Sequence, residues 1–122
     1  MILDNFFSIT AFSGNESGYS AVIKLNPEHP VYQGHFPEQP VVPGVCTMHI
    51  VKTCAEKAIG RALTYAYVAQ CRYIAIITPD MEQLSVCLQL TEQAERWLLN
   101  AEVCVAETVM MRLKAELILC KC

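Results

Sequence analysis

The chain has 122 residues, of which 53% are hydrophobic and 17% are charged. This length and composition allow one substantial core and leave no room for a second, so we expect a single domain over residues 1–122. Nine basic and twelve acidic residues give a net charge of −3 without any basic run. That balance argues against nucleic acid as a partner.

The N-terminal fifteen residues lack the basic start and apolar run of a secretory signal, and no segment has the uninterrupted apolar length of a membrane span. We therefore expect a soluble, cytoplasmic protein that does not bind membranes. Seven cysteines, an odd number with no CxxC pair, are scattered along the chain. This pattern is typical of small buried hydrophobes in a reducing compartment, and it predicts no disulfide framework, metal site or cofactor.

Two strands are predicted before the first proline. Residues 5–12 are rich in Phe, Ile and Thr, and residues 19–25 alternate between apolar and polar side chains. The polar run at 13–18 predicts a turn, so the two strands should form a hairpin. Pro27 and Pro30 then end the strand pattern.

A proline-rich loop follows, in the run GHFPEQPVVPGVCTMH at residues 34–49. Proline fixes φ, lacks an N–H group and disfavours helix in the residue before it, so residues 36–42 should form a stiff, extended loop that holds His35. After Pro43, apolar residues recur three or four apart, which predicts an amphipathic helix of about 20 residues over Gly44–Leu63. The stripe consists of Val45, Met48, Val51, Ala55, Ala58, Ile59 and Ala62.

The first turn of this helix is a candidate site. Its opening N–H groups have no intrahelical partner, the helix dipole is positive there, and Gly44 would let a carbonyl oxygen approach closely. His35 lies nine residues earlier and His49 five residues later, which suits acid/base chemistry at a polarised carbonyl. Alternatively, His35 is a capped loop residue beside a Pro-Gly turn. Cys46 could be a nucleophile in the first turn, although most such cysteines are structural.

The second half of the chain predicts an antiparallel sheet. The β-branched and aromatic run 66–77 predicts a strand, residues 78–80 a turn, and residues 84–90, 96–105 and 109–120 three more strands joined by short turns. Two strands, one helix and then hairpin-linked strands imply an α+β fold with the helix covering one face.

The last strand shows this arrangement in its side chains. Arg112, Lys114 and Glu116 alternate with Met111, Leu113, Ala115 and Leu117. One face should therefore be solvated and the other packed on the helix. A small open sheet leaves edge strands unpaired, so we expect at least a dimer that joins two sheets edge to edge.

Residues 34–45 read GHFP, then two further residues, then PVVPGV. This pattern resembles the active-site segment of the 3-hydroxyacyl-acyl-carrier-protein dehydratases. These have the hot dog fold, an antiparallel sheet wrapped around one long central helix. The preceding NPEHPVYQ is similar to the lead-in of that family, and residues 70–73 and 78–80 resemble its third-strand segment and following turn. The resemblance covers most of the chain and is densest over residues 26–63.

The resemblance implies dehydration of a 3-hydroxyacyl thioester, carried by acyl carrier protein, to the trans-2-enoyl thioester in fatty-acid or polyene-type biosynthesis. His35 would move the α-proton, the Gly44 amide would hold the thioester carbonyl, and two catalytic side chains would meet from different protomers. Where the family has a carboxylate, five residues after the glycine, this chain has His49, whose imidazolium could also protonate a departing hydroxyl. Further substrate-binding candidates are Phe36, Pro43, Val45 and Thr53.

Other interpretations remain open. His49, Lys52, Thr53 and Glu56 could form only a polar flank of the helix. The missing carboxylate then favours a catalytically weak or silent hot dog subunit, which binds acyl chains or forms a hetero-oligomer with an active dehydratase. A thioesterase of the same fold is disfavoured because no acidic nucleophile or base lies beside Gly44.

Overall fold

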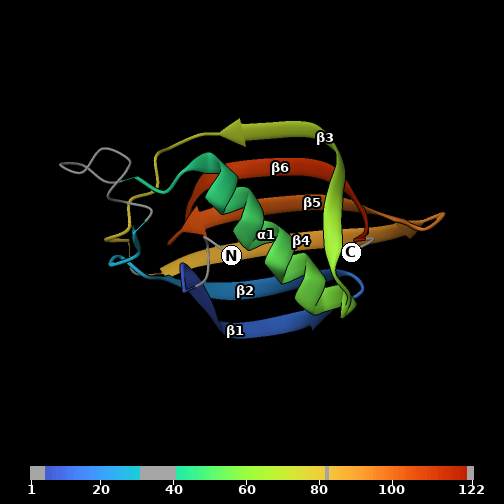
Figure 1. The fold of residues 1–122 in the computed structure, drawn as a ribbon, viewed down its shortest axis with the longest axis horizontal. Coiled ribbons are helices and arrows are strands. Elements are labelled where there is room, and N and C mark those ends of the chain that lie inside the picture. The colour runs from blue at the N-terminus through green and yellow to red at the C-terminus, as the bar shows by residue number, and fades with distance from the viewer. Residues whose placement is uncertain (1–4, 31–40, 82, 121–122) are drawn as a thin grey trace.

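One helix, α1, crosses one face of a six-stranded antiparallel sheet (Figure 1). The structure is a computed structural model, and it describes residues 5–30, 41–81 and 83–120. The strand order in the sheet is β1-β2-β4-β5-β6-β3. In chain order the elements are β1 Phe7–Asn15, β2 Gly18–Leu25, α1 Gly44–Ile59, β3 Leu63–Tyr73, β4 Gln83–Gln93, β5 Arg96–Val105 and β6 Thr108–Leu119.

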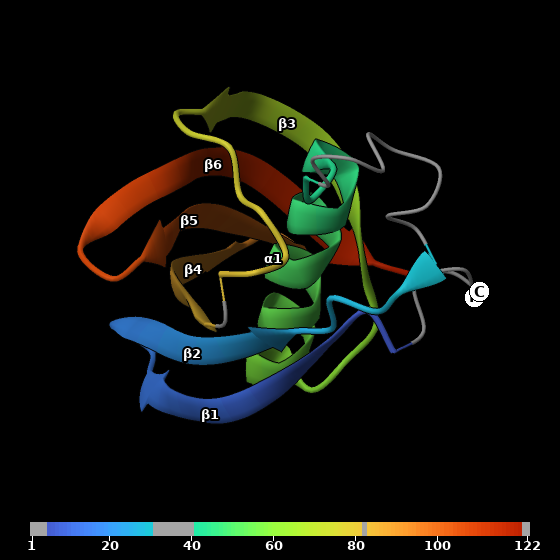
Figure 2. The ribbon, with the colours of Figure 1, turned by 90° about the vertical axis from the view of Figure 1, so that its left-hand side faces the viewer.

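The sheet curves around α1, so the predicted α+β hot dog fold is confirmed (Figure 2). The helix begins on the β3 side of the sheet and ends on the β1 side (Figure 1). In β6, Met111, Leu113 and Leu117 are almost completely buried, whereas Arg112 and Lys114 are exposed, which confirms the predicted alternation. Each such apolar side chain stabilises the fold by about 1.5–3 kcal/mol relative to leaving it in water.

The helix is 16 residues long and ends at Ile59, before the predicted end at Leu63. Gly60 adopts a left-handed φ of 80° and donates its N–H to the Glu56 carbonyl, which closes the last turn. The Glu56 side chain accepts the Leu63 N–H at 2.8 Å, so it also fixes where β3 begins. Within the described ranges, no helix is long and apolar enough to cross a membrane.

The buried face of α1 is rotated from the predicted stripe. Its members recur at helical spacing but include two cysteines and a threonine: Cys46, Thr47, Ile50, Val51, Cys54 and Ala55. Val45, which the apolar pattern placed on the buried side, is 74% exposed. Ile50 and Val51 are completely buried on this face, and the small Cys and Thr side chains leave room for the sheet beside them.

Strand β3 ends earlier than the predicted strand over residues 66–77. It lies at the edge of the sheet and pairs with β6, with register shifts between Tyr65 and Tyr67 and again near Val68. The apolar residues at 74–77 leave the sheet, and the Ile77 carbonyl accepts the Val42 N–H at 2.7 Å. This segment therefore runs beside the approach to α1, where Ile77 is buried and Ile74 and Ile76 remain exposed.

Candidate functional site

The start of α1 lies where the sequence predicts it. Pro43 is extended, with φ −60° and ψ 145°, and Gly44 is the first helical residue. The Pro43 carbonyl accepts the N–H groups of Cys46 at 3.0 Å and Thr47 at 3.2 Å. In the part of the chain that the structure describes, the N–H groups of Gly44 and Val45 meet no acceptor. Two donors at the positive end of the helix dipole are thus available to a carbonyl oxygen.

A cavity of about 300 Å³ opens beside this helix start. Gly44, Thr47 and Tyr73 line it on one side. The remaining lining is apolar and comes from Val41, Val42, Ile74, Ala75, Ile76, Ile77 and Met110. An apolar hollow with backbone donors at its edge suits an acyl chain that ends in a polar carbonyl.

Tyr73, the last residue of β3, is a site residue that the sequence patterns did not single out. A Cβ atom placed on Gly44 would lie 2.5 Å from the Tyr73 hydroxyl oxygen and 2.6 Å from its Cζ atom. A larger residue at position 44 would therefore force the Tyr73 ring to shift. Burial, with a smaller effect of the nearby Cys71 thiol, raises the pKa of Tyr73. The sequence placed Tyr73 in a segment resembling the dehydratases, but no spacing rule connects it to Gly44.

His49 lies on a different flank of α1 from the Tyr73 contact. Five residues at about 100° each place it about 140° around the helix from Gly44. Its ring meets Phe7 of β1 edge-on, with ring centroids 6.1 Å apart and an interplanar angle of 80°. Burial and then the nearby Lys52 lower the pKa of His49, and Glu56 opposes them. The neutral imidazole is therefore favoured at neutral pH.

The other polar residues on this flank are engaged with the backbone. The Thr53 hydroxyl donates to the His49 carbonyl at 2.9 Å, and the Glu56 carboxylate accepts the Leu63 N–H. Because its hydrogen is engaged in this bond, Thr53 could hold a water molecule only by accepting a hydrogen bond from it. Thr53 and Glu56 therefore fit a polar helix flank. The His49 ring is the group on this flank that could donate or accept a proton.

The structure describes some of the remaining candidate residues and not others. His35 and Phe36 lie outside the described residues, so their roles stay predictions. Pro43 uses its carbonyl within the helix start, and Val45 is exposed and does not line the cavity. His29 is buried, and its ring meets Phe6 edge-on with ring centroids 5.3 Å apart.

The cysteines are not all buried as the sequence predicted, but differ in their exposure. Cys46 and Cys54 are buried in the core, whereas Cys87 is exposed on the sheet. Burial raises the pKa of Cys46, and this disfavours the thiolate that a nucleophile requires. Across residues 5–30, 41–81 and 83–120, no group of three or more His, Cys, Asp or Glu side chains is placed to hold a metal ion.

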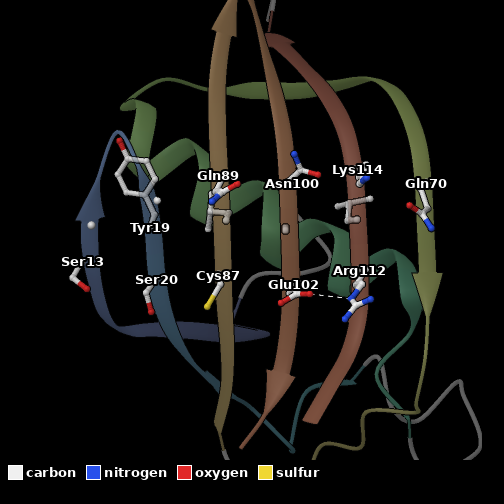
Figure 3. Close-up of a pocket in the computed structure, with 15 residues that line it drawn as sticks. Ser13, Tyr19, Ser20, Gln70, Cys87, Gln89, Asn100, Glu102, Arg112 and Lys114 are labelled. Atoms are coloured by element: carbon white, nitrogen blue, oxygen red, sulfur yellow. Dashed lines mark hydrogen bonds and ion pairs between the residues drawn. The ribbon is translucent and has the colours of Figure 1, made fainter. Parts of the chain in front are cut away.

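A second hollow, of about 560 Å³, lies on the opposite face of the sheet. Figure 3 shows its side chains turned away from α1. Gln89, Asn100 and Lys114 line it, together with Glu102 and Arg112, whose ion pair spans 2.9 Å. This is the solvated face that the alternation predicts, and its lining carries more polar and charged side chains than that of the cavity beside Gly44.

Solved structures confirm the fold. The dehydratase heterocomplex ApeI:P from Xenorhabdus doucetiae gives a TM-score of 0.73 at 16% identity, covering 91% of this chain and 96% of the matched chain. The virulence protein Cj0977 from Campylobacter jejuni gives 0.72 at 9% identity, covering 98% and 87%. YhdA from Lactococcus lactis, a candidate thioesterase, gives 0.69 at 10% identity, covering 98% and 95%. At these identities the likeness establishes the hot dog fold alone.

The family is established by sequence. A search of curated proteins finds no match to the chain. A family model described as "ApeI-like: ApeI dehydratase" matches residues 12–111, which span both the proline-rich loop and all of α1. The chain therefore belongs to the ApeI-like dehydratase family.

Proposed function

We propose that the protein dehydrates a 3-hydroxyacyl thioester, carried on acyl carrier protein, to the trans-2-enoyl thioester in fatty-acid or polyene-type biosynthesis. The observation that carries this proposal is the dehydratase family match over residues 12–111. The described geometry supports it, because the Gly44 N–H meets no acceptor among the described residues and Gly44 lines an apolar cavity. An acyl thioester has the complementary shape, with an apolar chain and one polar carbonyl.

The chemistry needs a proton acceptor, a carbonyl donor and a group that assists the leaving hydroxyl. The Gly44 N–H polarises the carbonyl and thereby acidifies the α-carbon. His35 takes the α-proton, the C–H electron pair becomes the Cα=Cβ bond, and the Cβ–O bond breaks. The hydroxyl departs as water after it receives a proton. Each positioned acid or base contributes about 10²–10⁴-fold to such a step.

His49 is proposed to assist the departing hydroxyl. Because burial lowers its pKa, its ring is mainly neutral at neutral pH. A neutral ring orients the hydroxyl, or a water molecule on it, through its N–H group, and it acts as a proton donor after it has been charged. The dehydratase resemblance brings the two catalytic side chains together from different protomers, so the His49 of one chain would serve the His35 of the other.

A second hot dog subunit is proposed to dock on the β3 edge. This strand is at the end of the sheet, and large apolar side chains are exposed on it and beside it. They are Val45 at 74%, Tyr67 at 57%, Val68 at 37%, Ile74 at 48% and Ile76 at 68% exposure. An unpaired edge and exposed large apolar side chains both favour association. The partner is a second copy or, as in the ApeI:P heterocomplex, a related chain.

A silent subunit is the second candidate function. It is favoured by the histidine at position 49, where the resembling dehydratases have a carboxylate. In that case the chain alone has no turnover and gains it only with a carboxylate-bearing relative. His49→Glu would supply the missing group within this chain.

One experiment separates these functions. The purified chain is incubated with 3-hydroxyacyl thioesters of carrier protein and of coenzyme A, and enoyl product and free thiol are followed separately. We expect enoyl product, its loss in His35→Ala, reduced rates in His49→Ala, and equal or higher rates in His49→Glu. Free thiol without enoyl product would identify a thioesterase instead. No product from the wild-type chain, with a gain in His49→Glu, would identify a silent subunit.

A further inference from the structure

Tyr73 lies directly against the residue that is proposed to hold the substrate carbonyl. Its hydroxyl oxygen, Cζ and Cε1 atoms are 2.5, 2.6 and 3.1 Å from the position that a Cβ atom on Gly44 would take. The ring comes from the end of the edge strand, whereas Gly44 opens the helix. The fold thus brings a phenol to the start of α1, at the side of the apolar cavity that both residues line.

The Tyr73 hydroxyl is the polar side-chain group best placed to reach a ligand there. Thr47 also lines the cavity, but it is buried, and its hydroxyl lies 3.5 Å from the Pro43 carbonyl. Tyr73 also lines the cavity, and about half of the residue, 52%, is exposed. The nearby Cys71 thiol is only a weak hydrogen-bond acceptor, so it competes poorly with a carbonyl oxygen for the Tyr73 hydroxyl.

We propose that the Tyr73 hydroxyl donates a second hydrogen bond to the thioester carbonyl oxygen held by the Gly44 N–H. This inference rests on the proposed dehydration. When the α-proton leaves, negative charge builds on the carbonyl oxygen, and it returns to the carbon chain as the hydroxyl departs. Two donors aimed at that oxygen stabilise the charge more than one amide does. Tyr73 keeps its proton throughout, which its raised pKa favours.

A purely structural role for Tyr73 would not require its hydroxyl group. If Tyr73 only covered Gly44, its ring would be sufficient and its hydroxyl dispensable. Tyr73→Phe keeps the ring and removes the oxygen, so it separates the two roles. Tyr19→Phe is the matched control, because Tyr19 stacks on Phe12 in the β1–β2 hairpin and lies outside the proposed site.

The test uses a trans-cinnamoyl thioester of pantetheine as a chromophoric product analogue, together with the dehydration assay on the full-length protein. Polarisation of the carbonyl shifts the absorption of this probe to longer wavelength. We expect Tyr73→Phe to reduce that shift and to lower kcat by about 10²-fold, as removal of one oxyanion donor does elsewhere, with KM changed less than about threefold. Tyr19→Phe should match the wild type in both measurements.

The outcomes also separate this inference from the proposed function. Equal kcat and equal spectral shift in wild type and Tyr73→Phe would overturn the role of Tyr73 while dehydration stands. A spectral shift that depends on Tyr73, without enoyl formation from hydroxyacyl substrates, would support the carbonyl site and overturn the dehydratase. Failure of the wild-type protein to shift the probe at saturating concentration would overturn the inference.

Discussion

The contact between Gly44 and Tyr73 can be tested without any substrate. Gly44→Ala places a methyl group 2.6 Å from the Tyr73 Cζ atom. Carbon atoms normally approach to about 3.5–4.0 Å, so the ring must move by about 1 Å. Turning a side chain away from its rotamer destabilises by about 0.5–1.5 kcal/mol, and the ring also loses part of its packing. Alanine offsets this by up to about 1 kcal/mol, because it is the better helix former.

We therefore expect Gly44→Ala alone to destabilise the protein by about 1 kcal/mol. In a Tyr73→Ala background the collision disappears, and the same change should stabilise by about 0.5–1 kcal/mol. The predicted coupling is then about 1.5–2 kcal/mol, within the range for residues in contact. Tyr73→Phe is the control, because its ring carbon stays in place and Gly44→Ala should remain destabilising there.

Urea unfolding at fixed protein concentration measures these free energies. The fluorescence of Trp97 reports the transition, since it is the single tryptophan and is 8% exposed. Independent sites add within about 0.5 kcal/mol. If Gly44→Ala and Tyr73→Ala are additive to that extent, the ring does not rest on the helix start and the proposed carbonyl site loses its geometric basis.

Two further predictions concern His49 and the β3 edge. Because the pKa of His49 is lowered in the folded protein, its ring takes up a proton at a higher pH in the unfolded chain than in the folded chain. Its stabilising contribution is therefore present above pH 6.5, the ordinary histidine value, and is lost as pH falls below it. Urea midpoints should fall less on acidification in His49→Gln than in wild type, and an identical fall would contradict the burial of this ring. Val68→Lys should reduce the oligomer mass in light scattering, because a charge on an edge strand blocks pairing, whereas Ser8→Lys on the opposite edge strand should leave it unchanged.

Local sequence signals predicted the backbone of the site and most of the fold. The Pro-Gly pair fixed the helix start at Gly44 because proline cannot donate to the turn before it and suits the position just ahead of a helix. Alternation predicted which side of β6 is buried because successive strand residues face opposite sides of a sheet. These rules act over a few residues, so the sequence alone is enough to apply them.

Tertiary contacts decided the rest. The buried face of α1 includes Cys46 and Cys54, whose side chains suit either a surface or a core until the sheet closes over them. Phe7 meets His49 only because folding brings the start of β1 to the side of α1. Tyr73 reaches Gly44 only because β3 joins the sheet beside β6, at the edge where the helix begins. The two residues of each pair are far apart along the chain. Their contact depends on the order of the strands in the sheet, which no local spacing of residues encodes.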